Sequence, residues 1–198
     1  MKLKDICSLN AGLVTSRKKY SEKDRLHRVK KISYKLLNLN AVDDLGIIDQ
    51  SKIEVFHSNE LLDEQYLTSQ GDILVRLNYP YTSTMITEEN VGLVIPSYFI
   101  ILRLENTRFT SEYVAWYLNT DRIKKELMRN QSGTLIPSIN QKNLGDLDIE
   151  ERLREDQENI SHLFQLVIRE RQLIKKLAEE KENYYRGITE SILNKEED

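Results

Sequence analysis

The sequence is poor in the residues that build disulfides, metal sites and tight turns. It has one cysteine, three prolines, seven glycines and three histidines among 198 residues. The single Cys7 excludes an internal disulfide and a cysteine-based zinc site, and its ordinary role is that of a small buried side chain. The histidines His27, His57 and His162 are dispersed, without the spacing of metal ligands. We therefore expect no metal site in this chain.

Long apolar runs are also missing. No stretch approaches the roughly 20 apolar residues that cross a bilayer, and the start, MKLKDICSLNAG, lacks the apolar core of a signal peptide. We expect a cytoplasmic protein that does not bind membranes. With 39% hydrophobic and 31% charged residues, the composition is typical of a folded domain joined to one unusually polar element.

Signatures of nucleotide binding and of nucleophilic catalysis are absent, since the sequence has no P-loop, no G-x-G-x-x-G turn and no nucleophile elbow. One motif, NYPY at residues 78–81, is similar to the Asn-Pro-Pro-Tyr loop of amino-methyltransferases, whose Tyr stacks on a flipped base. Tyr79 stands in place of the first proline, and no glycine-rich turn for S-adenosylmethionine precedes it. We expect a chain without catalytic residues or cofactor, in which this loop faces DNA or packs as a turn.

Positive charge is concentrated near the N-terminus, although the formal net charge of the whole chain is −3. Residues 16–35 contain nine lysines or arginines against two acids, Glu22 and Asp24. Phosphates respond to such a local field more than to the net charge. The alternative is an ordinary solvated basic surface. The candidates for DNA contact in this segment are Arg17, Lys18, Lys19, Lys23, Arg25 and Arg28.

Further candidates for DNA contact lie in two expected loops. Arginine is the usual partner of guanine, and asparagine or glutamine that of adenine. For the hydroxyl-bearing residues of the second loop, a structural return segment without DNA contact is the open alternative. These candidates are Arg76, Asn78, Tyr79, Tyr81, Asn130, Gln131, Ser132 and Thr134.

Residues 1–150 are predicted to form one α+β (mixed α/β) domain. The Gly-Asp turn before residues 73–77 indicates an apolar strand, and two more strands are expected on either side of Pro96. A turn at Asp43–Gly46 is expected to lead into further strand. A single helix is expected from Thr110 or Ser111 to about residue 130, with its N-terminus capped by a hydroxyl. Residues 143–149 are expected to lead into the domain's last strand.

Residues 151–198 are predicted to form a second domain, one long amphipathic helix. The segment has no proline and one glycine, and its apolar residues recur at spacings of three, four and seven. About 40 helical residues span roughly 60 Å. An apolar stripe of that length needs a partner helix, from a second copy or from another protein. The stripe contains Ile160, Leu163, Phe164, Val167, Ile174, Leu177, Tyr184 and Ile188.

Four stretches in this order resemble the specificity (S) subunit of bacterial type I restriction–modification systems. They are LTSQGDILVRL (67–77), VIPSYFIILRLE (94–105) followed by SEYVAWYLNTDRIKKEL (111–127), SGTLIPSINQKNLGDLDI (132–149), and the segment from Arg154 to Leu193. The last stretch is similar to the family's spacer helix. The chain departs from the family where DIEERLREDQENI lacks the usual proline and has Asp156–Gln157 in place of Glu-Gln.

The resemblance implies a half-length form with one target-recognition domain and one spacer helix. It implies a non-catalytic subunit that binds double-stranded DNA at one half of a bipartite site. The long helix would form an antiparallel coiled coil in a homodimer and dock methyltransferase subunits, with a restriction subunit in a complete system. S-adenosylmethionine would bind in the methyltransferase partner. The alternative is a coiled-coil interaction protein that binds methyltransferase subunits without reading DNA.

Overall fold

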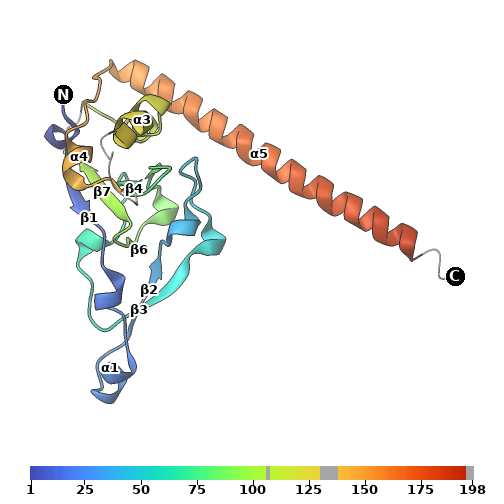
Figure 1. The fold of residues 1–198 in the computed structure, drawn as a ribbon, viewed down its shortest axis with the longest axis horizontal. Helices are drawn as coiled ribbons and strands as arrows, with labels where there is room; N and C mark the ends of the chain where they lie inside the picture. The colour runs from blue at the N-terminus through green and yellow to red at the C-terminus, as the bar shows by residue number, and fades with distance from the viewer. Residues whose placement is uncertain (106–107, 130–137, 195–198) are drawn as a thin grey trace. The chain divides into compact units, whose positions relative to one another are not determined.

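A computed structural model describes residues 1–105, 108–129 and 138–194. The chain divides into two compact units, Met1–Glu158 and Asn159–Asp198. The first unit is built from two small sheets with helices, and the second belongs to one long helix (Figure 1). The predicted combination of an α+β domain with a long C-terminal helix is confirmed.

The larger sheet of the first unit has four antiparallel strands in the order β1-β7-β4-β5. The central strands, β7 and β4, are almost entirely apolar and buried, as is expected for strands covered on both faces. The bounds are Cys7–Ala11 for β1, Ile73–Arg76 for β4, Ser83–Met85 for β5 and Phe99–Leu104 for β7.

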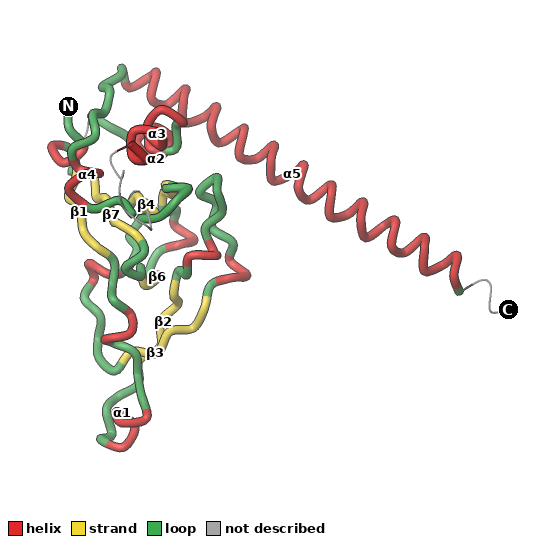
Figure 2. The backbone as a smooth tube through the Cα atoms, viewed as in Figure 1, coloured by secondary structure: helices red, strands yellow, loops and turns green. Residues whose placement is uncertain are grey.

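The smaller sheet has the order β3-β2-β6, in which β2 is antiparallel to β3 and parallel to β6. Residues in β2 alternate between half-buried and exposed, so Ile32, Tyr34 and Leu36 lie on the inner face and Ser33 and Lys35 on the outer face. The strands are Ile32–Leu36 for β2, Glu54–Ser58 for β3 and Leu93–Val94 for β6. Figure 2 shows these strands apart from the larger sheet.

Part of the core of the first unit lies between the two sheets, and part lies where α2 (Ser111–Leu118) packs against β4 and β5. One cluster joins β4 and β7 to the loop after β2 through Leu37, Val42, Leu74, Phe99 and Ile101. A second, smaller cluster packs the smaller sheet against the segments after β1 and β3 through Leu13, Phe56, Leu62 and Val94. Within the described residues, six short 3-10 helices lie before or between the strands, at Leu3–Asp5, Thr15–Arg17, Leu39–Ala41, Gln50–Lys52, Glu64–Tyr66 and Glu88–Asn90.

Gly12 follows β1 at a point where two chain segments nearly touch. A Cβ atom there would collide with the carbonyl oxygen of Pro96. Leu13 and Pro96 form an isolated parallel bridge, and Leu13 N donates to Ile95 O at 2.7 Å. Only glycine allows this approach, because it alone has no Cβ.

The expected single helix after Thr110 is wrong, because the structure contains two. Thr110 caps α2 (Ser111–Leu118) as predicted, since its hydroxyl accepts from Tyr113 N at 3.1 Å. Helix α2 ends with Asn119 as its C-cap, and the chain continues as α3 (Asp121–Arg129). The Asn119 side chain accepts from Ser83 N at 3.0 Å and donates to Ser83 O at 2.7 Å. These two hydrogen bonds pair the backbone N–H and C=O of Ser83 in β5. Helical periodicity in the sequence cannot reveal such a contact.

Two expected strands are also corrected. The turn at Asp43–Gly46 forms, with Gly46 N donating to Asp43 O, but only the bridge between Val42 and Ile48 follows it. Residues 143–149 do not lead into a strand. Their first residues belong to α4 (Gln141–Gly145), which forms because the Asn140 side chain accepts from Asn143 N at 2.8 Å and caps a helix. An isolated antiparallel bridge between Lys2 and Asp148 joins the start of the first unit to the segment after α4.

The long helix α5 (Arg154–Leu193) has 40 residues, which confirms the predicted element. Its first turn is fixed by Gln157, which is fully buried. The Gln157 amide accepts from Thr110 N at 3.0 Å and donates to Arg108 O at 2.7 Å and to Arg152 O at 2.9 Å. These hydrogen bonds join the start of α5 to the start of α2.

Candidate nucleic-acid interface

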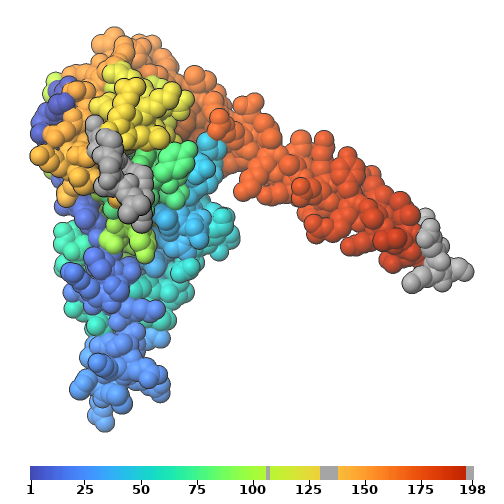
Figure 3. All heavy atoms as spheres, in the orientation of Figure 1, coloured from blue at the N-terminus to red at the C-terminus, as the bar shows by residue number. Residues whose placement is uncertain are grey.

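The basic residues near the N-terminus lie on an excursion between β1 and β2. We call residues 17–31 the basic tip. It contains α1 (Glu22–Leu26) and protrudes beyond β2 and β3 at one end of the first unit (Figures 1 and 3). The base of the tip is held by β3: Lys19 bridges Ser58, and Tyr20 N donates to His57 O at 2.8 Å. The tip is therefore a projection whose base is supported by β3.

A capping box formed by Ser21 and Asp24 caps the N-terminus of helix α1. Ser21 N donates to the Asp24 carboxylate at 2.7 Å, and Asp24 N donates back to Ser21 Oγ at 3.4 Å. The Ser21 hydroxyl also donates to this carboxylate at 2.6 Å. These hydrogen bonds lower the pKa of Asp24. One of the two acids of the segment is thus used to hold the helix.

Most cations of the basic tip are open to solvent. Five of the six predicted there form no ion pair within the residues that the structure describes: Arg17, Lys19, Lys23, Arg25 and Arg28. The sixth, Lys18, pairs with Glu60, and this hydrogen bond raises the pKa of Lys18. The open side chains are available for phosphate oxygens, and Lys18 is held by its own domain.

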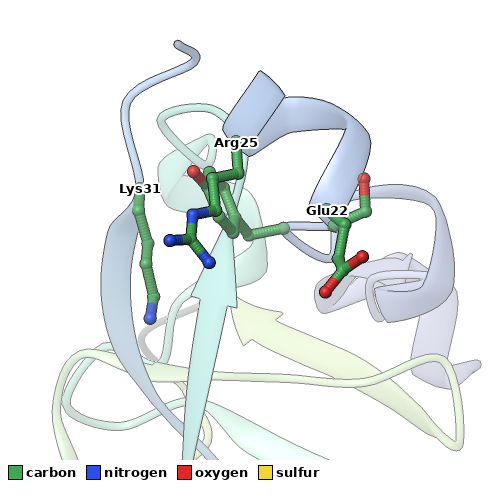
Figure 4. A pocket seen from close by; sticks show the side chains of 5 residues that line it. Glu22, Arg25 and Lys31 are labelled. Carbon is green, nitrogen blue, oxygen red and sulfur yellow. The ribbon is translucent and has the colours of Figure 1, made fainter. Parts of the chain in front are cut away.

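A shallow hollow lies on the side of the tip, lined by Tyr20, Ser21, Glu22, Arg25 and Lys31. Figure 4 shows the guanidinium of Arg25 between the side chains of Lys31 and Glu22. The Lys31 Nζ atom lies 5.9 Å from the centroid of the Tyr20 ring. Two cations against one carboxylate suit a phosphate group, because arginine and lysine bind phosphate oxygens through charge-assisted hydrogen bonds.

Sequence reasoning missed Tyr20 and Lys31 as parts of this hollow. Lys31 was not among the candidates for DNA contact, and it lies immediately before β2. The two residues come together because the tip folds back on itself, and no spacing in the sequence reveals such a return. A tyrosine beside lysines was the one available signal.

The second predicted cluster, at residues 76–81, lies elsewhere on the first unit, since Figure 1 shows α1 far from β4. Tyr79 is 68% exposed, whereas Tyr81 is 1% exposed. A DNA contact by the Tyr81 ring would therefore require the loop to rearrange. Arg76 ends β4 with its Nη1 atom 3.5 Å from Val42 O, and Asn78 bridges Ser138.

The remaining four candidates, Asn130, Gln131, Ser132 and Thr134, lie outside the described residues. Across the described ranges, no group of three metal-ligating side chains is found. No described helix is both long and apolar enough to span a bilayer. The Cys7 thiol is buried and donates to Leu3 O at 3.1 Å, and burial raises its pKa to about 12.

Helix α5 exposes large apolar side chains along its length. Ile174 and Leu177, near its middle, are 59% and 57% exposed, and Leu163, Tyr184 and Ile188 are also exposed. Three other residues of the predicted stripe, Ile160, Phe164 and Val167, are half-buried. Such a surface is unusual for a helix without a partner.

Comparison with models of protein families and with curated protein sequences gave no match. Comparison with solved structures gave clear ones. The HsdS subunit from Thermoanaerobacter tengcongensis matches over 89% of this chain, with a TM-score of 0.63 and 12% sequence identity. A chain from a structure of the assembly and conformational transition of the type I R-M system matches over 92%, with a TM-score of 0.62 and 14% identity.

A third match is the S subunit of the type I restriction–modification system from M. genitalium, with a TM-score of 0.51, 14% identity and 89% coverage of this chain. The chain spans 43% of the length of the Thermoanaerobacter tengcongensis HsdS subunit and 45% of the chain from the type I R-M system structure. It spans 40% of the M. genitalium S subunit. The predicted resemblance is therefore confirmed as a likeness of fold: this chain folds like part of a type I restriction–modification S subunit.

Proposed function

We propose that this chain is a DNA-recognition subunit of a type I restriction–modification system. The observation that carries the proposal is the fold shared with S subunits over about nine-tenths of the chain. The basic tip supports it independently, because its open cations create a local positive field on a chain whose formal net charge is −3.

In this proposal residues 1–150 form the target-recognition domain and residues 151–198 form a spacer and dimerisation helix. Arg25 and Lys31 bind the phosphate backbone from the hollow of the basic tip. Tyr79, the exposed ring of the second loop, is a candidate for contact with bases or sugars. Phosphate contacts fix the position on the duplex, and contacts to base edges carry the specificity.

The exposed apolar side chains of α5 support a helical partner for this element. A second copy of the chain would give a dimer with two-fold symmetry. Such a dimer reads two half-sites related by the same symmetry, so its target is an inverted repeat with a fixed spacer. The length of α5, roughly 60 Å for 40 residues, would set that spacer.

Catalysis belongs to partner subunits in this account. A methyltransferase subunit that holds S-adenosylmethionine docks on the dimer and methylates adenine, and a restriction subunit joins it in a complete system. The NYPY loop gives little support to a stand-alone methyltransferase, because the Tyr81 ring that would stack on a flipped base is 1% exposed.

The proposal is tested by selection of duplexes from a random double-stranded pool on the purified full chain. We expect one split, inverted-repeat motif, lost or weakened in the double variant Arg25→Ala/Lys31→Ala. Lys52→Ala is the matched control, since Lys52 pairs with Asp49 outside the tip. A chain that binds methyltransferase but enriches no motif would be an interaction protein that does not read DNA, and the proposal would fail.

A further inference from the structure

The basic tip carries an apolar side chain that the fold leaves open. Leu26 is the last residue of α1 and is 82% exposed, more than any other large apolar side chain among the described residues. It belongs to neither core cluster of the first unit. A single exposed leucine on a protein surface is ordinary, so its surroundings decide what it can do.

Open cations flank this leucine in the chain. Lys23, Arg25, Arg28 and Lys30 lie within four residues of Leu26, and none of them forms an ion pair among the residues that the structure describes. A ligand for this surface needs anionic groups around a small apolar group. Duplex DNA has this chemistry, because phosphates border each groove and methyl groups of thymine lie on the floor of the major groove.

Hydrogen bonds hold the end of α1 in one conformation. Arg28 N donates to Arg25 O at 3.1 Å. Val29 N donates to Asp24 O at 2.9 Å. Arg28 has a φ of 56°, so these bonds form a Schellman motif that ends the helix and turns the chain back. Leu26 is therefore presented by a formed turn, which keeps the entropic cost of binding small.

The shape of the tip selects the major groove. Helix α1 lies at the outer end of the projection (Figures 1 and 2). An α-helix with its side chains is about 10–12 Å across. The major groove, about 12 Å wide, admits a helix, whereas the minor groove, about 6 Å wide, does not. The apolar group that an exposed leucine meets there is the C5-methyl group of thymine.

We propose that the basic tip enters the major groove of the target duplex and that Leu26 contacts the methyl group of a thymine. Arg25 and Lys31 then bind phosphates at the edge of the groove. Leu26 favours an A·T pair at one position of the half-site and is thus a specificity-determining residue. This inference rests on the proposed function, which requires duplex DNA as the ligand, and it names the base that is read and the side chain that reads it.

Deoxyuridine tests the contact, because it pairs as thymidine does and lacks the methyl group. The duplex that the wild-type full chain selects from a random pool is remade with each thymidine replaced in turn. We expect one replacement in each half-site to weaken wild-type binding roughly fourfold, the effect of one buried methyl group. The other replacements should have little effect in fluorescence anisotropy. A selected motif without such a position would overturn the inference.

Leu26→Ala assigns the contact to this side chain. Alanine preserves α1, because its helix propensity is high. We expect the variant to bind the thymidine duplex at least about tenfold more weakly and to bind the thymidine and deoxyuridine duplexes equally. The slope of log affinity against log salt concentration should stay unchanged, since no phosphate contact is lost. The control is Leu153→Ala, which shortens a leucine that is 77% exposed outside the tip and should bind as the wild type does.

The results separate failure of the inference from failure of the proposed function. If Leu26→Ala lost affinity on deoxyuridine replacement as the wild type does, another residue would read the methyl group. If Leu26→Ala bound weakly while the wild type ignored every replacement, the leucine would contact DNA away from thymine methyl groups. Either result would overturn the inference and leave DNA recognition intact. A wild-type chain that selects no motif would overturn the proposed function itself.

Discussion

Ile101 in β7 is fully buried, whereas Ile174 in α5 is 59% exposed. The two isoleucines show how the units differ. The first unit encloses most of its large apolar side chains, both between its two sheets and between α2 and the larger sheet. The second unit leaves large apolar side chains in solvent, and in the proposed function a partner helix covers them. Changes in the first unit should therefore alter unfolding, and changes in the second should alter association.

The largest expected difference between the units concerns thiol reactivity. Burial raises the pKa of the Cys7 thiol to about 12, so at pH 8 the thiol stays protonated and its reactive thiolate is very scarce. We expect Cys7 to react with iodoacetamide at least about a thousandfold more slowly than a cysteine introduced at exposed position 165 by Gln165→Cys. Reaction at similar rates would contradict the buried position of Cys7. The rate should rise with pH toward the raised pKa.

A buried ion pair offers the next largest effect, on folding of the first unit. The Asp72 carboxylate accepts from Arg103 Nε at 3.0 Å and from Arg103 Nη2 at 3.1 Å, and also from Ser69 N. Asp72→Ala leaves a partly buried guanidinium without its acid, which should lower the free energy of unfolding by about 3 kcal/mol. Urea denaturation followed by circular dichroism measures it.

The control for this prediction is Glu60→Ala, which removes an exposed carboxylate that pairs with Lys18. We expect the midpoint of urea denaturation to change little, because exposed ion pairs contribute little to stability. If the two variants lost equal stability, the Asp72–Arg103 pair would have no special role in the core.

The second unit should show the opposite behaviour. Ile174→Asp places a carboxylate among the exposed apolar side chains of α5. In the proposed dimer this change should weaken dimerisation by at least about a hundredfold, because a buried charge without a partner is costly. Light scattering should then report a monomer whose first unit unfolds as in the wild type. The control is Gln165→Asp, which adds the same charge to α5 outside the apolar stripe. An Ile174→Asp chain that remains dimeric would mean that another surface makes the dimer.

The smallest predicted effect concerns the basic tip. Arg25→Ala should reduce the slope of log affinity for DNA against log salt concentration by about one, because one phosphate contact is lost. Lys52→Ala, outside the tip, should leave the slope unchanged. Fluorescence anisotropy over a salt series measures both, and an unchanged slope for Arg25→Ala would exclude this side chain from the phosphate contacts.

Much of the fold could be predicted from local patterns. The strands around Pro96, the Thr110 cap and the 40-residue helix follow from alternation, capping chemistry and helical periodicity, which are properties of neighbouring residues. The break at Asn119 was missed because its amide serves Ser83, which is distant in the sequence. The α4 helix was missed although Asn140 carries a capping signal, since the apolar residues after it suggested a strand.

The candidate site was predictable in charge and not in shape. The run of lysines and arginines indicates the basic tip, but the meeting of Arg25, Lys31 and Tyr20 depends on how the chain returns to β2. The burial of Tyr81 beside the exposed Tyr79 likewise depends on packing around β4. Composition identifies candidate residues, and tertiary contacts decide which of them are accessible.

DNA recognition by this chain is tested most directly by methylome sequencing. Cells that express the chain together with a type I methyltransferase subunit are compared with cells that express the methyltransferase alone. We expect new methyladenine at one split, inverted-repeat motif, with less methylation at this motif in cells that express Arg25→Ala/Lys31→Ala. A stable complex of the two proteins that produces no new methylated motif would contradict it, and the basic tip would then be an ordinary solvated surface.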